Sequence, residues 1–120
     1  MEWTLDKERP ICPQICEKIC AAIATGEFEP HDRLLSVREV AVVAGVNPNT
    51  VQKAFEMLES EKLIYSIRGA GWYVGNCADE AREKLRILAE TKVKNLVNTL
   101  SSLVFTKENI LEMIKENQHE

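Results

Sequence analysis

The chain has 120 residues, of which 45% are hydrophobic and 28% charged, and its formal net charge at pH 7 is −4. This hydrophobic content is typical of a folded protein and argues against a disordered chain, and no apolar run approaches the roughly 20 residues that span a bilayer. The amino-terminal sequence MEWTLDKERP is charged and lacks the apolar core of a signal peptide, so we expect a cytoplasmic protein with no membrane partner.

The first predicted element is an amphipathic helix over residues 11–25, which Gly26 ends. Its apolar face consists of Ile11, Ile15, Ile19, Ala22 and Ile23. Residues 27–35 follow as a connector. This helix has the pattern of one that packs its apolar face on a core.

Three cysteines, Cys12, Cys16 and Cys20, are spaced four residues apart along this helix, and Cys77 lies far from them in the sequence. The spacing differs from the Cys-x-x-Cys pairs of the usual zinc sites, and thiols in the cytoplasm are expected to be reduced. We interpret the three as small apolar packing residues. A thiol sensor or soft-metal site is the alternative, which requires accessible thiolates of low pKa.

Residues 36–53, SVREVAVVAGVNPNTVQK, predict two short helices joined by a tight turn. Ser36 and Glu39 have capping-box spacing at the start of the first helix, and Gly45 follows its last turn, where a left-handed residue is preferred. Asn47 caps the second helix, which runs to about Ser60. Two helices joined by a glycine turn, the second polar at its start, form the helix-turn-helix arrangement that enters the major groove of DNA.

A β-hairpin is predicted next, with strands at 63–67 (LIYSI) and 72–75 (WYVG) and a turn at 68–71 (RGAG). A hairpin after a helix-turn-helix is a wing. Arg68 lies at its tip, where it would reach a minor groove or a phosphate.

From about residue 78 the pattern predicts a long helix over 79–104, broken at Val104–Phe105, and a last short helix capped by Thr106. A helix of about 26 residues is about 39 Å long, and its apolar stripe is too wide for the preceding domain to cover. We therefore expect a dimerisation tail. Its interface residues are Leu85, Leu88, Leu96, Leu100, Leu103, Ile110, Leu111 and Ile114. The predicted fold is mainly α with a small β-hairpin: a winged helix-turn-helix domain over 1–76 and a helical tail over 77–120.

The segments EPHDRLLSVREVA, GVNPNTVQKAFEMLESEKLI and RGAGWYV, after one helix, resemble the DNA-binding domain of the GntR family of bacterial winged helix-turn-helix regulators. The opening WTLDKERPI and the two-helix tail resemble its YtrA-like subfamily, which lacks the larger ligand-binding domain of other subfamilies. The resemblance covers nearly all of residues 3–118. It implies a homodimeric transcription repressor that binds a pseudo-palindromic operator in double-stranded DNA and controls a nearby operon, often of transporter genes.

Carried over to matching positions, the resemblance assigns DNA contacts to the S-x-R-E segment, the start of the recognition helix and the wing. The residues are Arg38, Asn47, Pro48, Asn49, Thr50, Gln52, Arg68 and Gly69. Arg33 and Lys53 are added because their positive charges fall in or beside the same helices. We expect Asn49, Thr50 and Gln52 on base edges. Phosphates would be held by Lys53, Arg33 and the backbone amides at the helix start. A surface ion pair of Arg38 with Glu39 or Glu61 is the alternative use of that arginine.

Three positions depart from the family pattern: His31 stands where the family has glycine, Leu35 where it has proline, and Trp72 is an unusual wing residue. We expect His31 to fill a turn rather than bind a metal. Trp72 would pack on the hairpin or touch a sugar. His31 and Leu35 lie in the connector and bear on its geometry more than on base contacts.

The sequence contains no arrangement typical of an enzyme. Its carboxylates are scattered, His31 and His119 are isolated, no Ser or Cys is paired with a histidine, and RGAG is too short for a phosphate loop. We expect no catalytic residues, cofactor or metal ligands. The acidic net charge leaves open a winged-helix module that binds protein instead of DNA. The operator sequence, the regulated genes and any small-molecule effector do not follow from these residues.

Overall fold

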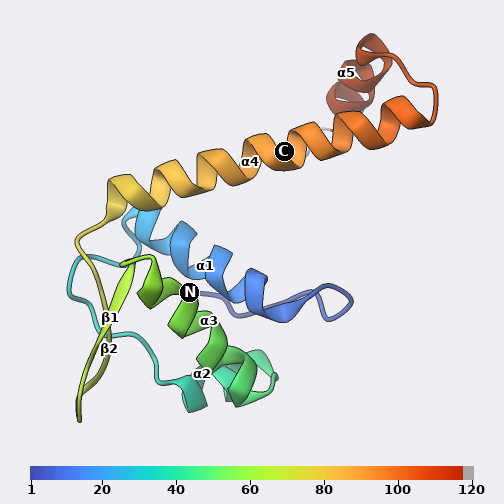
Figure 1. The fold of residues 1–120 in the computed structure, drawn as a ribbon. Helices are drawn as coiled ribbons and strands as arrows, with labels where there is room; N and C mark the ends of the chain where they lie inside the picture. Colours follow the sequence, from blue (N-terminus) through green and yellow to red (C-terminus); the bar gives the residue numbers. More distant parts are fainter. Residues whose placement is uncertain (118–120) are drawn as a thin grey trace. The chain divides into compact units, whose positions relative to one another are not determined.

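The structure is a computed structural model that describes residues 1–117, so His119 lies outside the described residues. Its elements follow the predicted order (Figure 1). They are α1 (Ile11–Thr25), α2 (Val37–Ala44), α3 (Pro48–Ser60), β1 (Ile64–Ile67), β2 (Gly71–Val74), α4 (Ala78–Ser102) and α5 (Lys107–Glu116). The predicted fold class, mainly helical with one antiparallel hairpin, is confirmed. Within residues 1–117 no helix combines the length and the apolar character needed to cross a membrane.

The ends of α2 and α3 form as their cap residues predict. At the start of α2, the Ser36 hydroxyl accepts from the Glu39 amide at 3.1 Å, and the Glu39 carboxylate accepts from the Ser36 amide at 2.9 Å. Gly45 ends the helix with a φ of 67°, in the left-handed region that favours glycine. Asn47 then caps α3 by accepting from the Asn49 amide at 2.8 Å. The turn between the two helices is therefore specified by side chains that are local in the sequence.

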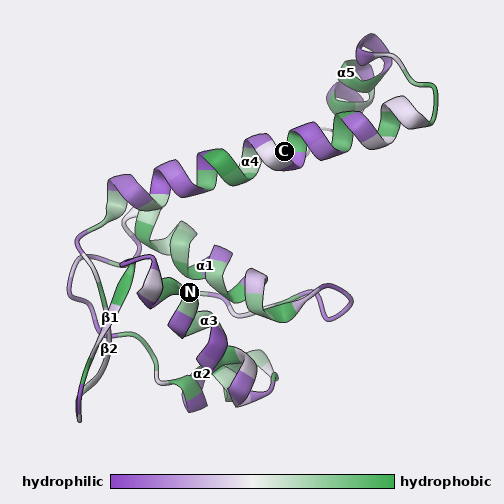
Figure 2. Ribbon diagram, viewed as in Figure 1, coloured by the Kyte–Doolittle hydropathy of each residue, from purple (hydrophilic) through white to green (hydrophobic). Residues whose placement is uncertain are grey.

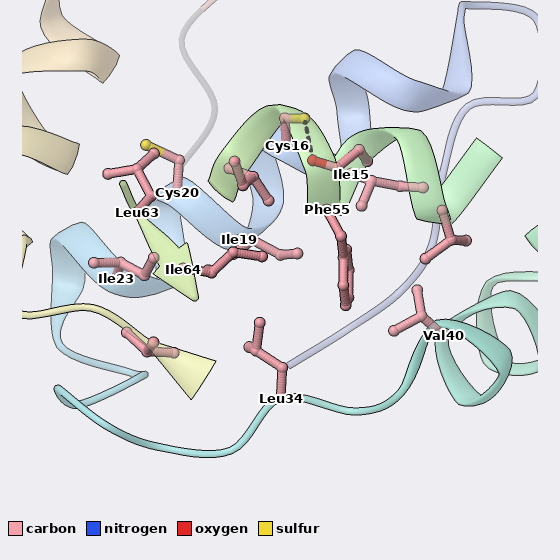
Figure 3. Close-up of a cluster of buried hydrophobic side chains, with 14 of the residues drawn as sticks. Ile15, Cys16, Ile19, Cys20, Ile23, Leu34, Val40, Phe55, Leu63 and Ile64 are labelled. Atoms are coloured by element: carbon pink, nitrogen blue, oxygen red, sulfur yellow. Dashed lines mark hydrogen bonds between the residues drawn. The ribbon is translucent and has the colours of Figure 1, made fainter. Parts of the chain in front are cut away.

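The core of the amino-terminal domain lies where α3 packs against both α1 and α2. Figure 3 shows Ile15 and Ile19 of α1 close to Phe55 of α3, and all three side chains are fully buried. Trp72 of β2 meets Phe55 edge-on, with ring centroids 5.4 Å apart. Trp72 was expected to pack on the hairpin or touch a sugar; it packs instead on Phe55 of α3 and so anchors the wing to the recognition helix.

The wing is an antiparallel hairpin in which Ile64 pairs with Val74 and Ile67 with Gly71. β1 is one residue shorter than the predicted strand 63–67, and β2 is shifted by one residue from the predicted strand 72–75. We predicted residues 27–35 to be a connector, but residues 31–34 form hydrogen bonds with β2. The Leu34 amide donates to the Trp72 carbonyl at 2.9 Å, and the Val74 amide donates to the Asp32 carbonyl at 2.8 Å. The connector is thereby held along the outer edge of the hairpin.

The chain divides into two compact units, Met1–Leu85 and the residues from Arg86 onward. The first unit extends beyond residue 76 because the first turns of α4 pack on its core: Ala81 is fully buried and Leu85 lies against the same cluster. The second unit contains the rest of α4 and α5. Between these two helices Val104 has a φ of 62°, and Thr106 and Asn109 form the capping box that starts α5.

Candidate DNA-binding site

The amino-terminal half of α3 has one buried and one exposed face. Val51, Ala54, Phe55 and Leu58 are fully buried. Asn49, Gln52 and Lys53 are exposed and lie three and four residues apart, so they share one face of the helix. Thr50 is half-buried. Three of the side chains expected to meet DNA are thus presented together to solvent.

The first backbone amides of α3 are engaged or absent. Pro48 has no N–H, the Asn49 amide donates to the Asn47 side chain, and the Thr50 amide donates to the Asn47 carbonyl at 3.0 Å. Local capping satisfies these amides in this structure. That they hold a phosphate stays a prediction.

The alternative use of Arg38 as a surface ion pair is not observed. The Glu39 carboxylate bonds within the capping box, where the Ser36 amide and hydroxyl hold the pKa of this carboxyl below its usual range. Glu61 pairs instead with Lys84. Among residues 1–117, Arg38, Lys53 and Arg68 form no ion pair, and all three are exposed. Their charges are available to an anionic partner.

Arg33 is positioned by the edge pairing of the connector. The backbone of Arg33 forms an isolated antiparallel β-bridge with Tyr73 of β2. Its guanidinium lies beside Gly71: a Cβ added at Gly71 would be 3.3 Å from the Arg33 Nε. Gly71 also has a φ of 120°, a backbone conformation in which a side chain is disfavoured. Arg33 therefore lies beside the start of β2, next to the turn that carries Arg68 and Gly69.

The departure at His31 has a conformational explanation. His31 has a φ of 71°, the left-handed region that a glycine adopts without strain. Its amide donates to the Val74 carbonyl at 2.7 Å, and its Nδ1 lies 2.8 Å from the Tyr65 hydroxyl. The side chain thus fills a turn beside the wing, as expected. In the described part of the chain, no three His, Cys, Asp or Glu side chains are grouped as a metal site.

Two features of this region were not found by sequence reasoning. Lys7, from the amino-terminal segment, donates to the carbonyls of Ala44 and Gly45 at the turn between α2 and α3. Nothing local in the sequence links a lysine to a turn 37 residues away. Glu56 is exposed and falls on the same face of α3 as Gln52 and Lys53, which its i+4 and i+3 spacing indicates. Its carboxylate is the type of acceptor that reads a cytosine amino group.

Three of the four cysteines pack as apolar residues. Cys16, Cys20 and Cys77 are buried, and each thiol donates to a backbone carbonyl, those of Ala54, Ala81 and Leu63 respectively. Burial is the main cause that raises the pKa of Cys16 to about 12, and it also raises those of Cys20 and Cys77. These thiols lack the low pKa that a thiol sensor requires.

Comparison with known proteins agrees with this architecture. The family described as "Bacterial regulatory proteins, gntR family" matches residues 13–74. The chain is 34% identical to the HTH-type transcriptional repressor YtrA of Bacillus subtilis (strain 168) over 108 residues, 89% of this chain and 83% of that protein. It is 35% identical to a solved GntR family transcriptional regulator from Listeria monocytogenes, with a TM-score of 0.78 over 95% of this chain and 100% of that one.

A further match is the structure of AraR(DBD) in complex with operator ORX1, 30% identical, with a TM-score of 0.54 over 59% of this chain and 87% of that chain. The resemblance to the GntR family and to YtrA is therefore confirmed. The chain belongs to the GntR family of bacterial regulatory proteins, which are DNA-binding transcription regulators and not enzymes.

Proposed function

We propose that the protein is a homodimeric, sequence-specific repressor that acts in the cytoplasm on a pseudo-palindromic DNA operator. The observation that carries this proposal is the exposed face of α3. It gathers Asn49, Gln52 and Lys53 on a helix whose opposite face is locked into the core by Phe55 and Leu58. A rigid helix with a polar, solvent-facing start is suited to lie in a major groove.

The side chains divide into two roles by their chemistry. Asn49 and Gln52 are amides, which pair with adenine through two hydrogen bonds, and Thr50 adds a hydroxyl and a methyl group. Arg38 and Lys53 carry charges with no ion-pair partner in residues 1–117, and such groups fix the position of a protein on the phosphate backbone. Arg33, Arg68 and Gly69 would follow the strand backbone beside the wing, while Asn47 and Pro48 set the start of α3.

We assign the pairing of two such domains to the exposed apolar side chains of α4 and α5. Figure 2 shows apolar residues recurring along α4 and α5. Of the eight proposed interface residues, Leu96, Leu103, Leu111 and Ile114 are exposed, and Leu88 and Leu100 are half-buried. Leu85 already lies against the core of the first unit and Ile110 is buried, so these two contribute less free surface. Exposed Ile87, Val93 and Phe105 extend the apolar surface beyond the predicted set.

This exposed surface supports a dimer because monomeric proteins seldom leave so many large apolar side chains in water. Stable obligate dimers bury more than about 2,000 Å², mostly apolar. Two copies related by a two-fold axis would place two α3 helices on successive major grooves, with half-sites separated by about 34 Å. The repressor role rests on similarity to the relative named a transcriptional repressor, and it would work by occluding RNA polymerase.

The test combines sedimentation with operator titration. Leu96→Glu places a charge in the proposed interface, where burying it unpaired is costly. Asn98→Glu is the matched control, since Asn98 is exposed and two residues away, on the opposite side of α4. We expect wild type and Asn98→Glu to sediment as dimers at micromolar concentration, and Leu96→Glu to dissociate and lose operator affinity. A wild-type monomer with full operator affinity would contradict the dimer.

A further inference from the structure

We propose that Cys12, Cys16 and Met57 form a binding site for a soft monovalent cation of the Cu(I) class, at the contact between α1 and α3. The observation behind it is a sulfur–sulfur contact between elements far apart in the sequence. The Cys12 Sγ lies 3.5 Å from the Met57 Sδ, across 45 residues of chain.

The third sulfur belongs to the same place. Cys16 follows Cys12 by one turn of α1, so the two side chains share a face of the helix. Both face α3. Cys12 contacts Met57. The Cys16 thiol donates to the Ala54 carbonyl, at 3.5 Å, one turn earlier on α3, as the dashed line at Cys16 in Figure 3 shows. Two thiols and a thioether are therefore concentrated within one turn of each helix.

This set of donors selects the type of ion. Thiolate and thioether sulfurs favour Cu(I), whereas hard cations take oxygen ligands, and zinc sites use four Cys, His or carboxylate ligands without a thioether. Metal–sulfur bonds are about 2.3 Å, so two sulfurs that share a trigonal ion are about 4.0 Å apart. The Cys12–Met57 separation of 3.5 Å needs only a small outward movement to reach this spacing.

An ion has a route to the cluster from solvent. Met57 is 47% exposed and Cys12 is half-buried, while Cys16 is only 7% exposed and forms the inner wall. Binding forms two Cu–thiolate bonds and one Cu–thioether bond, and it releases the Cys12 and Cys16 protons to solvent. No electron is transferred. Because burial and the neighbouring Cys12 raise the pKa of Cys16 to about 12, the ion must displace that proton rather than meet a preformed thiolate.

Cys20 supplies a matched control within the same stripe. It follows Cys16 by one further turn, but its thiol donates to the Ala81 carbonyl at 3.4 Å and only 1% of the residue is exposed. No thioether contact to Cys20 is observed among the described residues. The site therefore comprises the first two cysteines of the stripe and excludes the third.

The test is an anaerobic titration of the full, reduced chain with Cu(I) in the presence of bicinchoninate, a chromophoric chelator that reports the Cu(I) the protein does not hold. Variants are Cys12→Ser, Cys16→Ser and Met57→Leu, with Cys20→Ser as the control, and circular dichroism checks each fold. Met57→Leu is an exposed, volume-conserving change, so it keeps the test informative if Cys16→Ser unfolds.

We expect wild type and Cys20→Ser to withhold one equivalent of Cu(I). Removal of outer partners already weakens metal sites about 10–100-fold, so loss of either thiolate ligand is expected to weaken binding by at least about 100-fold, and Met57→Leu by at least about 10-fold. No saturable Cu(I) binding by wild type would overturn the proposal. Equal loss in Cys20→Ser, an unchanged affinity in Met57→Leu, or preferential binding of Zn(II) would also overturn it.

Discussion

The Lys7 ammonium donates a hydrogen bond to the carbonyl oxygen of Ala44, 2.7 Å away, and so ties the amino-terminal segment to the last residue of α2. A second bond, at 2.8 Å, reaches the carbonyl of Gly45. Carbonyls at the end of a helix have no partner within the helix and carry partial negative charge. One cation therefore stabilises the turn that sets α2 against the recognition helix.

Lys7→Met should lower the free energy of unfolding by about 1 kcal/mol, the usual effect of a cation at a helix carboxyl terminus. Methionine keeps a long, unbranched side chain, so the change removes mainly the ammonium and its hydrogen bonds. Urea denaturation at fixed protein concentration measures the effect, with Lys94→Met as the control on an exposed lysine of α4. Equal midpoints for the two variants would show that the contact contributes nothing to stability.

Arg38→Ala should weaken operator binding by about 1–3 kcal/mol and leave the free energy of unfolding within about 0.5 kcal/mol of wild type. Arg38 is exposed and has no ion-pair partner in residues 1–117, so little folded-state contact is lost. Fluorescence anisotropy with labelled operator measures the affinity. Arg9→Ala, which breaks an exposed ion pair with Asp6, is the control. If both variants bind alike, Arg38 does not contact DNA.

Asn49→Ala and Gln52→Ala should reduce the preference for operator over random DNA, because amide side chains read base edges. Lys53→Ala should weaken binding to both DNAs about equally and reduce the salt slope by about one, because a lost phosphate contact releases one counterion fewer. Titrations at several salt concentrations separate these effects. The roles are reversed if Lys53→Ala alters sequence preference and Gln52→Ala does not.

The sequence predicted the helices and their caps because those signals are local. Ser36 with Glu39, Asn47 with Asn49, and Thr106 with Asn109 each satisfy backbone groups two or three residues away. Burial of Ile15 and Ile19 likewise followed from helical spacing. Contacts between segments far apart in the sequence were not predicted.

Lys7 meets Ala44 only after the amino-terminal segment has packed, and Gln14 holds that segment by donating to the Asp6 and Pro10 carbonyls. The pairing of residues 31–34 with β2 also has no periodic signal, since so short an edge segment resembles a connector. In the candidate site, sequence placed Asn49, Gln52 and Lys53 together. It did not reveal that the capping geometry occupies the amides at the start of α3.

The four thiols should differ sharply in reactivity in the native protein. Cys12 is the only cysteine that is not buried, whereas the other three are enclosed, and the pKa of Cys16 is raised to about 12. Both pH 8 and pH 9 lie far below the pKa of Cys16, so almost none of this thiol is ionised at either pH. Iodoacetamide labelling followed by peptide mass spectrometry should modify Cys12 first and the rest only in urea. Rapid native labelling of Cys16 would contradict the observed packing.

The measurement that tests the central proposal most directly is selection of random double-stranded DNA by the full-length protein, followed by sequencing of the bound pool. A two-fold dimer with one recognition helix per major groove predicts enrichment of an inverted repeat whose half-site centres are about 10 base pairs, or one helical turn, apart. Asn49→Ala in the same selection should relax the enriched bases of each half-site. A pool that stays random, or that enriches a single unpaired half-site, would contradict the account.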